Sequence, residues 1–141
     1  MKLKKTVKDL CAAAESEIET WDAATAIARQ NDPDVQLVDI RDVRELWREG
    51  GIPGALHAPR GMLEFWVDPD MSYARKEFQS GKRFVFFCAG GLRSALATKA
   101  VQDMGLSPVC HIRGGFAAWK EAGGATAPVE QKPPSGSKKP G

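Results

Sequence analysis

The segment that most limits the fold is Arg83-Phe84-Val85-Phe86-Phe87-Cys88, whose last five residues are nearly all apolar. An uninterrupted apolar run of this length is typical of a central parallel strand that is covered on both faces. Gly90 and Gly91 end the run. An apolar helical stripe follows over residues 94–104, and Gly105 stands where a helix often ends. The sequence therefore predicts a buried strand, a short glycine loop and a helix in succession.

The same alternation of strand and helix extends over most of the chain. Apolar runs predict further strands at residues 35–40, 55–57 and 108–112. Helical spacing and capping residues predict helices at residues 7–17, 21–30, 43–49 and 116–122. Thr20 is expected to cap the second helix, and Asp42 with Glu45 forms a capping-box pattern before the third. Residues 59–80 are predicted as mixed, with a weak helix at about 72–79. Strands that alternate with helices indicate an α/β protein with a parallel sheet.

The chain is predicted to hold one domain with a short addition at each end. A length of 141 residues suits a single hydrophobic core. Residues 1–17 are expected to form an accessory N-terminal helix, and residues 18–124 the main domain. From Pro128 onward the chain is mostly Pro, Gly, Ser and Lys with little to bury, so residues 125–141 are expected to be a disordered tail.

Charge and cysteine usage argue against several classes of protein. With 20 basic and 18 acidic residues, the net charge of +2 gives no reason to expect nucleic acid or a membrane surface as a partner. No apolar run approaches the ~20 residues needed to cross a bilayer, and acidic residues interrupt the N-terminal segment where a secretory signal would be apolar. Cys11, Cys88 and Cys110 are scattered without metal-ligand spacing. We therefore expect no disulfide framework, no metal and a reducing, cytoplasmic location.

The residues that carry chemistry form the loop after the buried strand, Cys88-Ala89-Gly90-Gly91-Leu92-Arg93-Ser94. In open α/β sheets, ligands bind outside the carboxyl ends of the strands, which is where Cys88 stands. The glycines allow successive N–H groups to turn inward as an anion nest, and the start of the next helix adds partial positive charge. Arg93 adds a full charge with a fork suited to oxyanions. Because all three effects favour a thiolate, Cys88 is the expected nucleophile.

Four motifs resemble the rhodanese family over roughly residues 18–124, and they stand in the family's order. They are Leu37-Val38-Asp39-Ile40-Arg41, Gly51-Ile52-Pro53-Gly54-Ala55, Cys88–Arg93 and Gly114-Gly115-Phe116-Ala117-Ala118-Trp119. The chain thus resembles a single-domain rhodanese. The resemblance implies a rhodanese-like fold, with a five-stranded parallel sheet flanked by helices on both faces. It also implies cysteine persulfide chemistry that needs no metal or other cofactor.

The resemblance implies an enzyme, a sulfurtransferase of the thiosulfate sulfurtransferase type. Cys88 would take a sulfane sulfur from thiosulfate or a persulfide and hold it as a persulfide. It would then pass the sulfur to a thiol, to cyanide or to a cysteine of a partner protein. Arg93 and the backbone N–H groups of residues 89–93 would hold the charge that moves onto sulfur. Many members that use thiosulfate have a basic residue after the cysteine, where this chain has Ala89, and this argues against thiosulfate as the physiological donor.

Two other functions stay open from the sequence. One is a non-enzymatic module that uses the fold for binding or regulation, although an intact Cys88 and its glycines disfavour it. The other is a phosphatase or arsenate reductase. Related enzymes of that kind have one more residue in the loop, whereas four residues separate Cys88 from Arg93 here, which favours sulfur over phosphate.

A second set of residues is predicted to lie near the rim of the pocket. Asp39 and Arg41 end a strand on the same side of the sheet as the loop, where a structural role in holding loops is preferred. The resemblance places Arg60 and Trp66 near the rim, together with Phe65, which suits core packing equally well. The remaining candidates are expected to be structural, namely His57, His111, Cys11 and Cys110.

Overall fold

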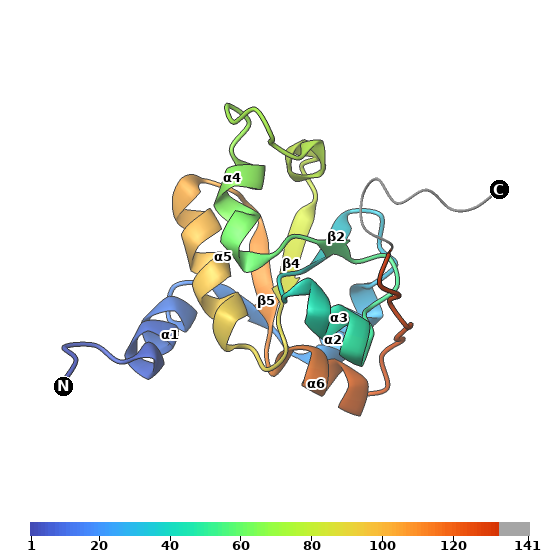
Figure 1. Ribbon diagram of the computed structural model, residues 1–141, viewed down its shortest axis with the longest axis horizontal. Helices are drawn as coiled ribbons and strands as arrows, with labels where there is room; N and C mark the ends of the chain where they lie inside the picture. Colours follow the sequence, from blue (N-terminus) through green and yellow to red (C-terminus); the bar gives the residue numbers. More distant parts are fainter. Residues whose placement is uncertain (133–141) are drawn as a thin grey trace.

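The computed structural model describes residues 1–132, and at its centre lies a parallel β-sheet of five strands (Figure 1). In the order in which they lie side by side, the strands are β1 (Glu19–Trp21), β5 (Val109–Ile112), β4 (Arg83–Phe87), β2 (Val35–Asp39) and β3 (Leu56–His57). Every neighbouring pair among them is parallel. The predicted α/β class with a five-stranded parallel sheet is therefore confirmed.

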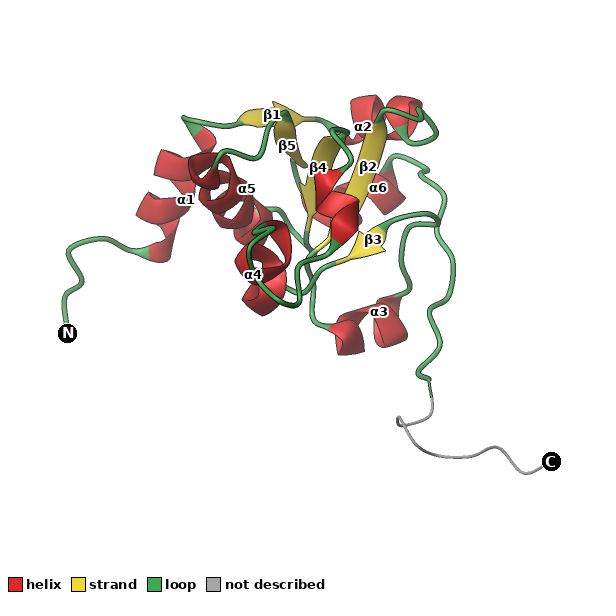
Figure 2. Ribbon diagram, turned by 90° about the horizontal axis from the view of Figure 1, so that it is seen from above, coloured by secondary structure: helices red, strands yellow, loops and turns green. Residues whose placement is uncertain are grey.

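Helices cover both faces of this sheet, as expected (Figure 2). One face carries α4 (Leu63–Val67) and α5 (Leu92–Met104), with α1 (Val7–Glu15) packed against α5. The other face carries α2 (Ala23–Arg29) and α6 (Gly115–Glu121). The helix α3 (Val43–Glu49) follows β2, and two short 3₁₀ turns, η1 (Arg60–Met62) and η2 (Lys76–Gln79), stand on either side of α4 in the sequence.

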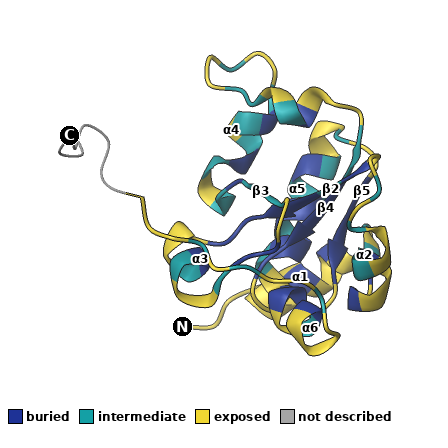
Figure 3. Ribbon diagram, turned by 90° about the vertical axis from the view of Figure 1, so that its right-hand side faces the viewer, coloured by how far each residue is buried: buried dark blue, intermediate teal, exposed yellow. Residues whose placement is uncertain are grey.

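The sheet separates two apolar clusters, because the side chains of a strand point alternately to its two faces. From β4, Phe84 and Phe86 pack toward α4 and α5, whereas Val85 and Phe87 pack toward α2 and α6. The three central strands, β2, β4 and β5, are the most continuously buried part of the molecule, and the outer faces of the helices are exposed (Figure 3). Burial on both faces explains why the sequence of β4 is apolar without interruption.

The parallel strands bring loops that are distant in the sequence to one edge of the sheet. Cys88 follows β4, and two other chain segments extend beyond their strands beside it. The Ile40 N–H donates to the carbonyl of Phe87 at 3.0 Å, and the Ala58 N–H donates to the carbonyl of Asp39 at 2.9 Å. This carboxyl edge of the sheet is where an open α/β fold places its ligand site.

The N-terminal side of the domain differs from the prediction. We expected a helix over residues 21–30 capped by Thr20, but Thr20 lies within β1 and pairs with His111 of β5. The helix α2 is capped instead by Asp22, whose carboxylate accepts a hydrogen bond from the Thr25 N–H at 2.8 Å. The physical reason is that threonine and tryptophan suit an edge strand, while aspartate is the stronger helix cap.

Residues 59–80 contain a helix that the sequence did not indicate. The helix α4 has only five residues, which is too short for helical spacing to be recognised. The 3₁₀ turn η2 occupies the end of the segment 72–79, where a weak helix was expected. The helix α5 also begins earlier than expected, at Leu92 rather than at residue 94. The last residues of the reactive loop therefore form the first turn of α5.

Residues after 124 contact the domain over a short distance. The indole N–H of Trp119 donates to the carbonyl of Ala125 at 2.9 Å, and Ala127 pairs with Gly51 through two backbone hydrogen bonds of 2.9 Å each. These contacts differ from the prediction of disorder for residues 125–127, because a backbone partner was available at Gly51. Residues 133–141 of the predicted tail lie outside the described part of the chain.

Candidate active site

Cys88 lies directly after β4, and its sulfur is enclosed by the loop that leads into α5. The residue is 1% exposed. Its Sγ accepts hydrogen bonds from the backbone N–H groups of Gly91, at 3.1 Å, and Ser94, at 3.4 Å. Both groups belong to the start of α5, where N–H groups lack helical partners and the helix dipole favours negative charge. This arrangement stabilises a thiolate by direct donation to sulfur.

Glycines on two sides let the chain close around Cys88. Gly91 caps α5 with a φ of +100°, a left-handed conformation that glycine adopts without strain. Gly115, at the start of α6, has a φ of +58°, and a Cβ on it would collide with the Cys88 carbonyl oxygen. That same carbonyl accepts a hydrogen bond from the Phe116 N–H at 2.8 Å. The start of α6 thus holds the backbone of the reactive residue in place.

Arg93 has a different partner from the one expected. Its two terminal nitrogens donate to the two carboxylate oxygens of Glu45 at 2.8 and 2.9 Å, which ties the start of α5 to α3. The bidentate contact raises the pKa of Arg93 and lowers the pKa of Glu45. We predicted Arg93 as a charge free to hold an oxyanion. In the structure a carboxylate already occupies its fork.

The outer surface of the loop is formed by Ala89, Gly90 and Leu92, all of which are exposed. A Cβ on Gly90 would meet nothing within 4 Å, so the space outside the loop is open at that point. The carbonyl of Leu92 accepts a weak hydrogen bond from the Cys11 thiol at 3.6 Å, which brings α1 against the loop. Burial raises the pKa of Cys11, and the nearby Glu15 adds to this effect.

Ser94 connects the loop to His111, for which the sequence interpretation expected a structural role. Its hydroxyl lies 3.6 Å from Cys88 Sγ and 2.9 Å from Nδ1 of His111. Both Ser94 and His111 are completely buried. Neither Glu45 nor His111 could be assigned to the site from local sequence, because Glu45 carried only a capping signal and His111 lay in a strand with nothing to connect it to Cys88.

Asp39 and Arg41 form a buried ion pair behind the site. Arg41 Nη2 lies 2.7 Å from a carboxylate oxygen of Asp39 and 2.8 Å from the carbonyl of Gly50. The guanidinium also stacks 4.3 Å from the ring centre of Phe116. Through these contacts Arg41 connects the end of β2 to the end of α3 and the start of α6. Arg41 also lines the pocket beside Ala89.

The other two residues predicted for the rim are occupied with their own neighbours. Arg60, in η1, pairs with Glu64 at 2.6 Å. Trp66, in α4, packs against the cluster that contains Cys88 and lies under the guanidinium of Arg75, 4.8 Å from the ring centre. Phe65 is 46% exposed. No hydrogen bond joins Arg60 or Trp66 to the loop within the described residues.

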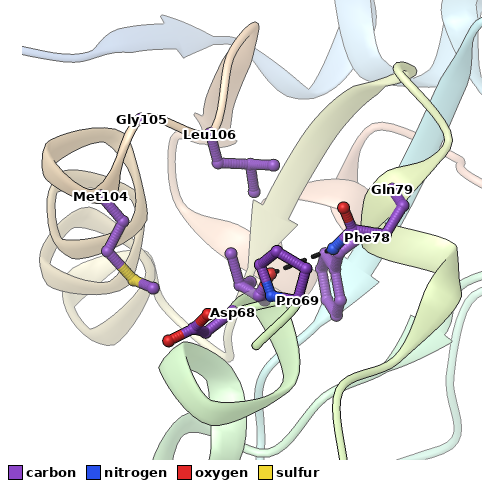
Figure 4. A pocket seen from close by; sticks show the side chains of 8 residues that line it. Asp68, Pro69, Phe78, Gln79, Met104, Gly105 and Leu106 are labelled. Atoms are coloured by element: carbon purple, nitrogen blue, oxygen red, sulfur yellow. Dashed lines mark hydrogen bonds between the residues drawn. The ribbon is translucent and has the colours of Figure 1, made fainter. Parts of the chain in front are cut away.

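Two pockets of different size lie at opposite ends of the sheet. The larger, of about 420 Å³, opens at the C-terminal end of α5, and Cys88 is not among the residues that line it (Figure 4). It is lined by Val67, Asp68, Pro69, Phe78, Gln79, Met104, Gly105 and Leu106. The smaller, of about 240 Å³, adjoins the reactive loop at Ala89. It is lined by Arg41, Glu45, Arg48, Glu49, Ala89, Phe116, Ala117 and Lys120. Arg41, Glu45 and Ala89 thus line the smaller pocket, whereas Cys88 lies under the loop and lines neither of the two.

Neither a metal cluster nor a membrane span is found in residues 1–132. Within this part of the chain, no three His, Cys, Asp or Glu side chains come together as metal ligands. None of its helices has the length and apolar character required to span a membrane.

Comparison with known proteins agrees with this geometry. The profile of the Rhodanese-like domain matches residues 22–122. A mouse protein, thiosulfate sulfurtransferase/rhodanese-like domain-containing protein 3, is 29% identical over 63% of this chain, and the chain spans only 60% of that relative's length.

Two solved structures resemble the whole domain. A Rhodopseudomonas palustris protein of unknown function, described as a possible tyrosine phosphatase, is 53% identical, with a TM-score of 0.87 over 90% of this chain and 98% of its own. The polysulfide-sulfur transferase of Wolinella succinogenes is 28% identical, with a TM-score of 0.67 over 86% of this chain and 87% of its own. On the extent of the profile match and these relatives, the chain belongs to the rhodanese-like domain family.

Proposed function

We propose that this protein is a sulfurtransferase that carries a sulfane sulfur on Cys88 as a persulfide. The observation that supports this most directly is the pair of N–H groups, from Gly91 and Ser94, that donate to Sγ at 3.1 and 3.4 Å. Membership of the rhodanese-like family and likeness to a polysulfide-sulfur transferase point the same way. All three cysteines are free, which suits a reducing, cytoplasmic setting.

The transfer takes two displacement steps. The Cys88 thiolate attacks the outer sulfur of the donor, and a new S–S bond forms. The donor's own bond to that sulfur breaks, and its electron pair leaves with sulfite or a thiolate. An acceptor such as cyanide, a thiol or a partner cysteine then attacks the terminal sulfur and releases Cys88 as a thiolate. The two N–H donors remain in place throughout, so little reorganisation is needed when charge moves onto and off Sγ.

The ion pair at the loop bears on the choice of donor. An anionic donor such as thiosulfate must compete with Glu45 for the fork of Arg93. Ala89 supplies no second cation. We therefore favour a persulfide over thiosulfate as the donor. That persulfide would be carried by a low-molecular-weight thiol or by a protein cysteine. The open space outside Gly90 supports an approach from that side.

Phosphatase activity is the second candidate, because the Rhodopseudomonas palustris relative is described as a possible tyrosine phosphatase. Against it stands the loop itself, in which four residues separate Cys88 from Arg93. The two N–H donors of this loop converge on a single sulfur atom. A phosphate needs donors spread over three oxygens, and Arg93 would have to leave Glu45 to provide them.

Intact-mass measurement tests the proposal. After incubation with glutathione persulfide, or with thiosulfate, and removal of the excess donor, the protein should gain one sulfur atom that a reductant removes. Cys88→Ser should not gain it and should lose transfer to cyanide, whereas Cys110→Ser should behave like the parent. Hydrolysis of an aryl phosphate by the parent, lost in Cys88→Ser and without persulfide formation, would establish the phosphatase instead.

A further inference from the structure

A buried polar chain leads away from Cys88 through the core of the domain. Cys88 Sγ lies 3.6 Å from the Ser94 hydroxyl, which lies 2.9 Å from Nδ1 of His111. On the far side of the imidazole, Nε2 lies 3.6 Å from a carboxylate oxygen of Glu15 in α1. Residues from the reactive loop, α5, β5 and α1 thus follow one another from the sulfur to the surface, where Glu15 is half exposed.

His111 is a polar residue at a fully buried position on a central strand. It is completely buried on β5, between Thr20 of β1 and Phe86 of β4, and faces the side of the sheet that α5 and α1 cover. Its Nε2 has no hydrogen-bond partner among the described residues. A buried polar atom without a partner costs free energy, and in native proteins such an atom calls for an explanation. An apolar side chain would fill this position without that cost.

The charges around the imidazole oppose one another. Burial lowers the pKa of His111, the negative charge of Glu15 on α1 raises it, and the positive charge of Arg113, just after β5, lowers it further. The groups on the neighbouring strands, Thr20 and Phe86, carry no charge. A neutral imidazole with its proton on Nε2 leaves Nδ1 free to accept from Ser94.

We propose that Ser94 and His111 form a proton path that takes up the proton of the Cys88 thiol, with Glu15 supporting the imidazolium that results. The S–H bond of Cys88 breaks, and its electron pair stays on sulfur as the thiolate. The Ser94 oxygen receives that proton while its own hydroxyl proton passes to Nδ1 of His111. The imidazolium then carries protons on both nitrogens, with Nε2 facing Glu15. Ser94 touches the reacting atom, and His111 is a positioning residue that acts through it.

This path also assigns a role to α1. The matched family profile begins at residue 22, so α1 lies outside it. The helix packs against α5 and brings Glu15 toward His111. We infer that this added helix supplies the outermost group of the path. The inference rests on the proposed function of Cys88 as a sulfur nucleophile, but its test does not require sulfur transfer.

The rate of alkylation of Cys88 by iodoacetamide, followed by peptide mass mapping across pH, reports directly on the thiolate. Ser94→Ala removes the hydroxyl but keeps the backbone N–H that donates to Sγ. The pH midpoint of alkylation should rise by about one unit, the scale of one lost hydrogen bond to an ionised group. Glu15→Gln, at a half-exposed position, should raise the midpoint by less.

Thr98→Val is the matched control. Thr98 is also completely buried on α5, one turn beyond Ser94, and its hydroxyl has no partner among the described residues. The control should leave the alkylation midpoint of Cys88 unchanged. Equal midpoints for Ser94→Ala and Thr98→Val would overturn the path. If the variants show the predicted shifts but the parent gains no sulfur from any donor, the proton path stands and the sulfurtransferase proposal fails.

Nitrogen chemical shifts of the imidazoles provide an independent measurement, because the chain has only two histidines, His57 and His111. In Cys88→Ala, His111 should lose its proton at a lower pH than in the parent, since the thiolate that stabilises the imidazolium is gone. His57, whose Nε2 lies 2.7 Å from the carbonyl of Arg41, serves as the internal control and should not change. An unchanged midpoint for His111 would contradict the proposal.

Discussion

Cys88 and Cys110 stand on or beside neighbouring strands of the same sheet, and both are closed off from solvent, yet their surroundings differ completely. Cys110 lies within β5, opposite Val85 of β4, where its side chain packs in the cluster under α2 and α6. Burial raises its pKa to about 12. Cys88 lies just past the end of β4, where two N–H groups from the start of α5 donate to its sulfur.

The difference shows that burial by itself does not decide whether a cysteine is reactive. Inside a strand, the backbone N–H groups are used by the neighbouring strands, so no backbone donor is left for a thiolate. Beyond the strand's end, the first N–H groups of the following helix are free. A cysteine just past the end of a strand is therefore a candidate nucleophile, whereas a cysteine inside the strand is a packing residue.

The largest effect should come from Gly115→Ala. This change would displace the backbone of Cys88, which the start of α6 holds, and leave the cysteine side chain unaltered. A Cβ at this position collides with the Cys88 carbonyl, and the φ of +58° adds left-handed strain of roughly 1–2 kcal/mol. Misplacement of reacting groups by about 1 Å can reduce rates by ~10²-fold, so sulfur transfer should fall by about that factor. Steady-state kinetics and thermal unfolding measure the two consequences.

Gly105→Ala is the control for backbone strain alone. Gly105 has a φ of +106°, but a Cβ there meets nothing within 4 Å, and it lies at the other end of α5. This variant should lose stability and keep the parent rate. If both variants lose stability equally and neither loses activity, contact with α6 does not position Cys88.

A smaller effect should come from Glu45→Gln, which frees Arg93 for anionic donors. Glutamine retains an oxygen for the Asp42 N–H, now bonded to Glu45 at 3.0 Å, so the capping box of α3 survives. The KM for thiosulfate should fall by up to about fivefold, since a partly exposed ion pair is worth up to ~1 kcal/mol. The KM for a neutral persulfide should stay constant. Glu64→Gln, which breaks the Arg60 pair instead, should alter neither value.

The smallest effect concerns Cys110 and appears only at alkaline pH. The pKa of the Cys110 thiol is near its ordinary value of 9.0 in the unfolded chain but about 12 in the folded protein. Its contribution to stability is therefore complete below pH 9.0 and is lost as pH rises toward 12. The free energy of unfolding of the parent should therefore fall more steeply above pH 9.0 than that of Cys110→Ala. The extra slope is at most ~1.4 kcal/mol per pH unit for one proton. Parallel urea titrations of the two proteins, under reducing conditions, would show no difference if Cys110 were not desolvated.

Much of the fold was predictable because its signals are local. The apolar run before Cys88 predicted the central strand, and Asp42 with Glu45 predicted the cap of α3, which the structure confirms. The strand β1 was missed, since three residues are too few to show a period and only pairing with β5 makes them a strand. The helix α4 was missed for the same reason of length.

The sequence by itself determined the fold class and the place of the reactive loop, because apolar periodicity, glycines and helix caps act on residues a few positions apart. It could not determine the partners of that loop. Arg93 meets Glu45 across 48 positions, and Ser94 meets His111 across 17. Such contacts depend on the order of the strands and the packing of α1, α3 and β5 around the carboxyl edge of the sheet. Only the tertiary structure therefore decided that Arg93 is paired with a carboxylate and that the buried His111 lies next to Ser94, beside Cys88.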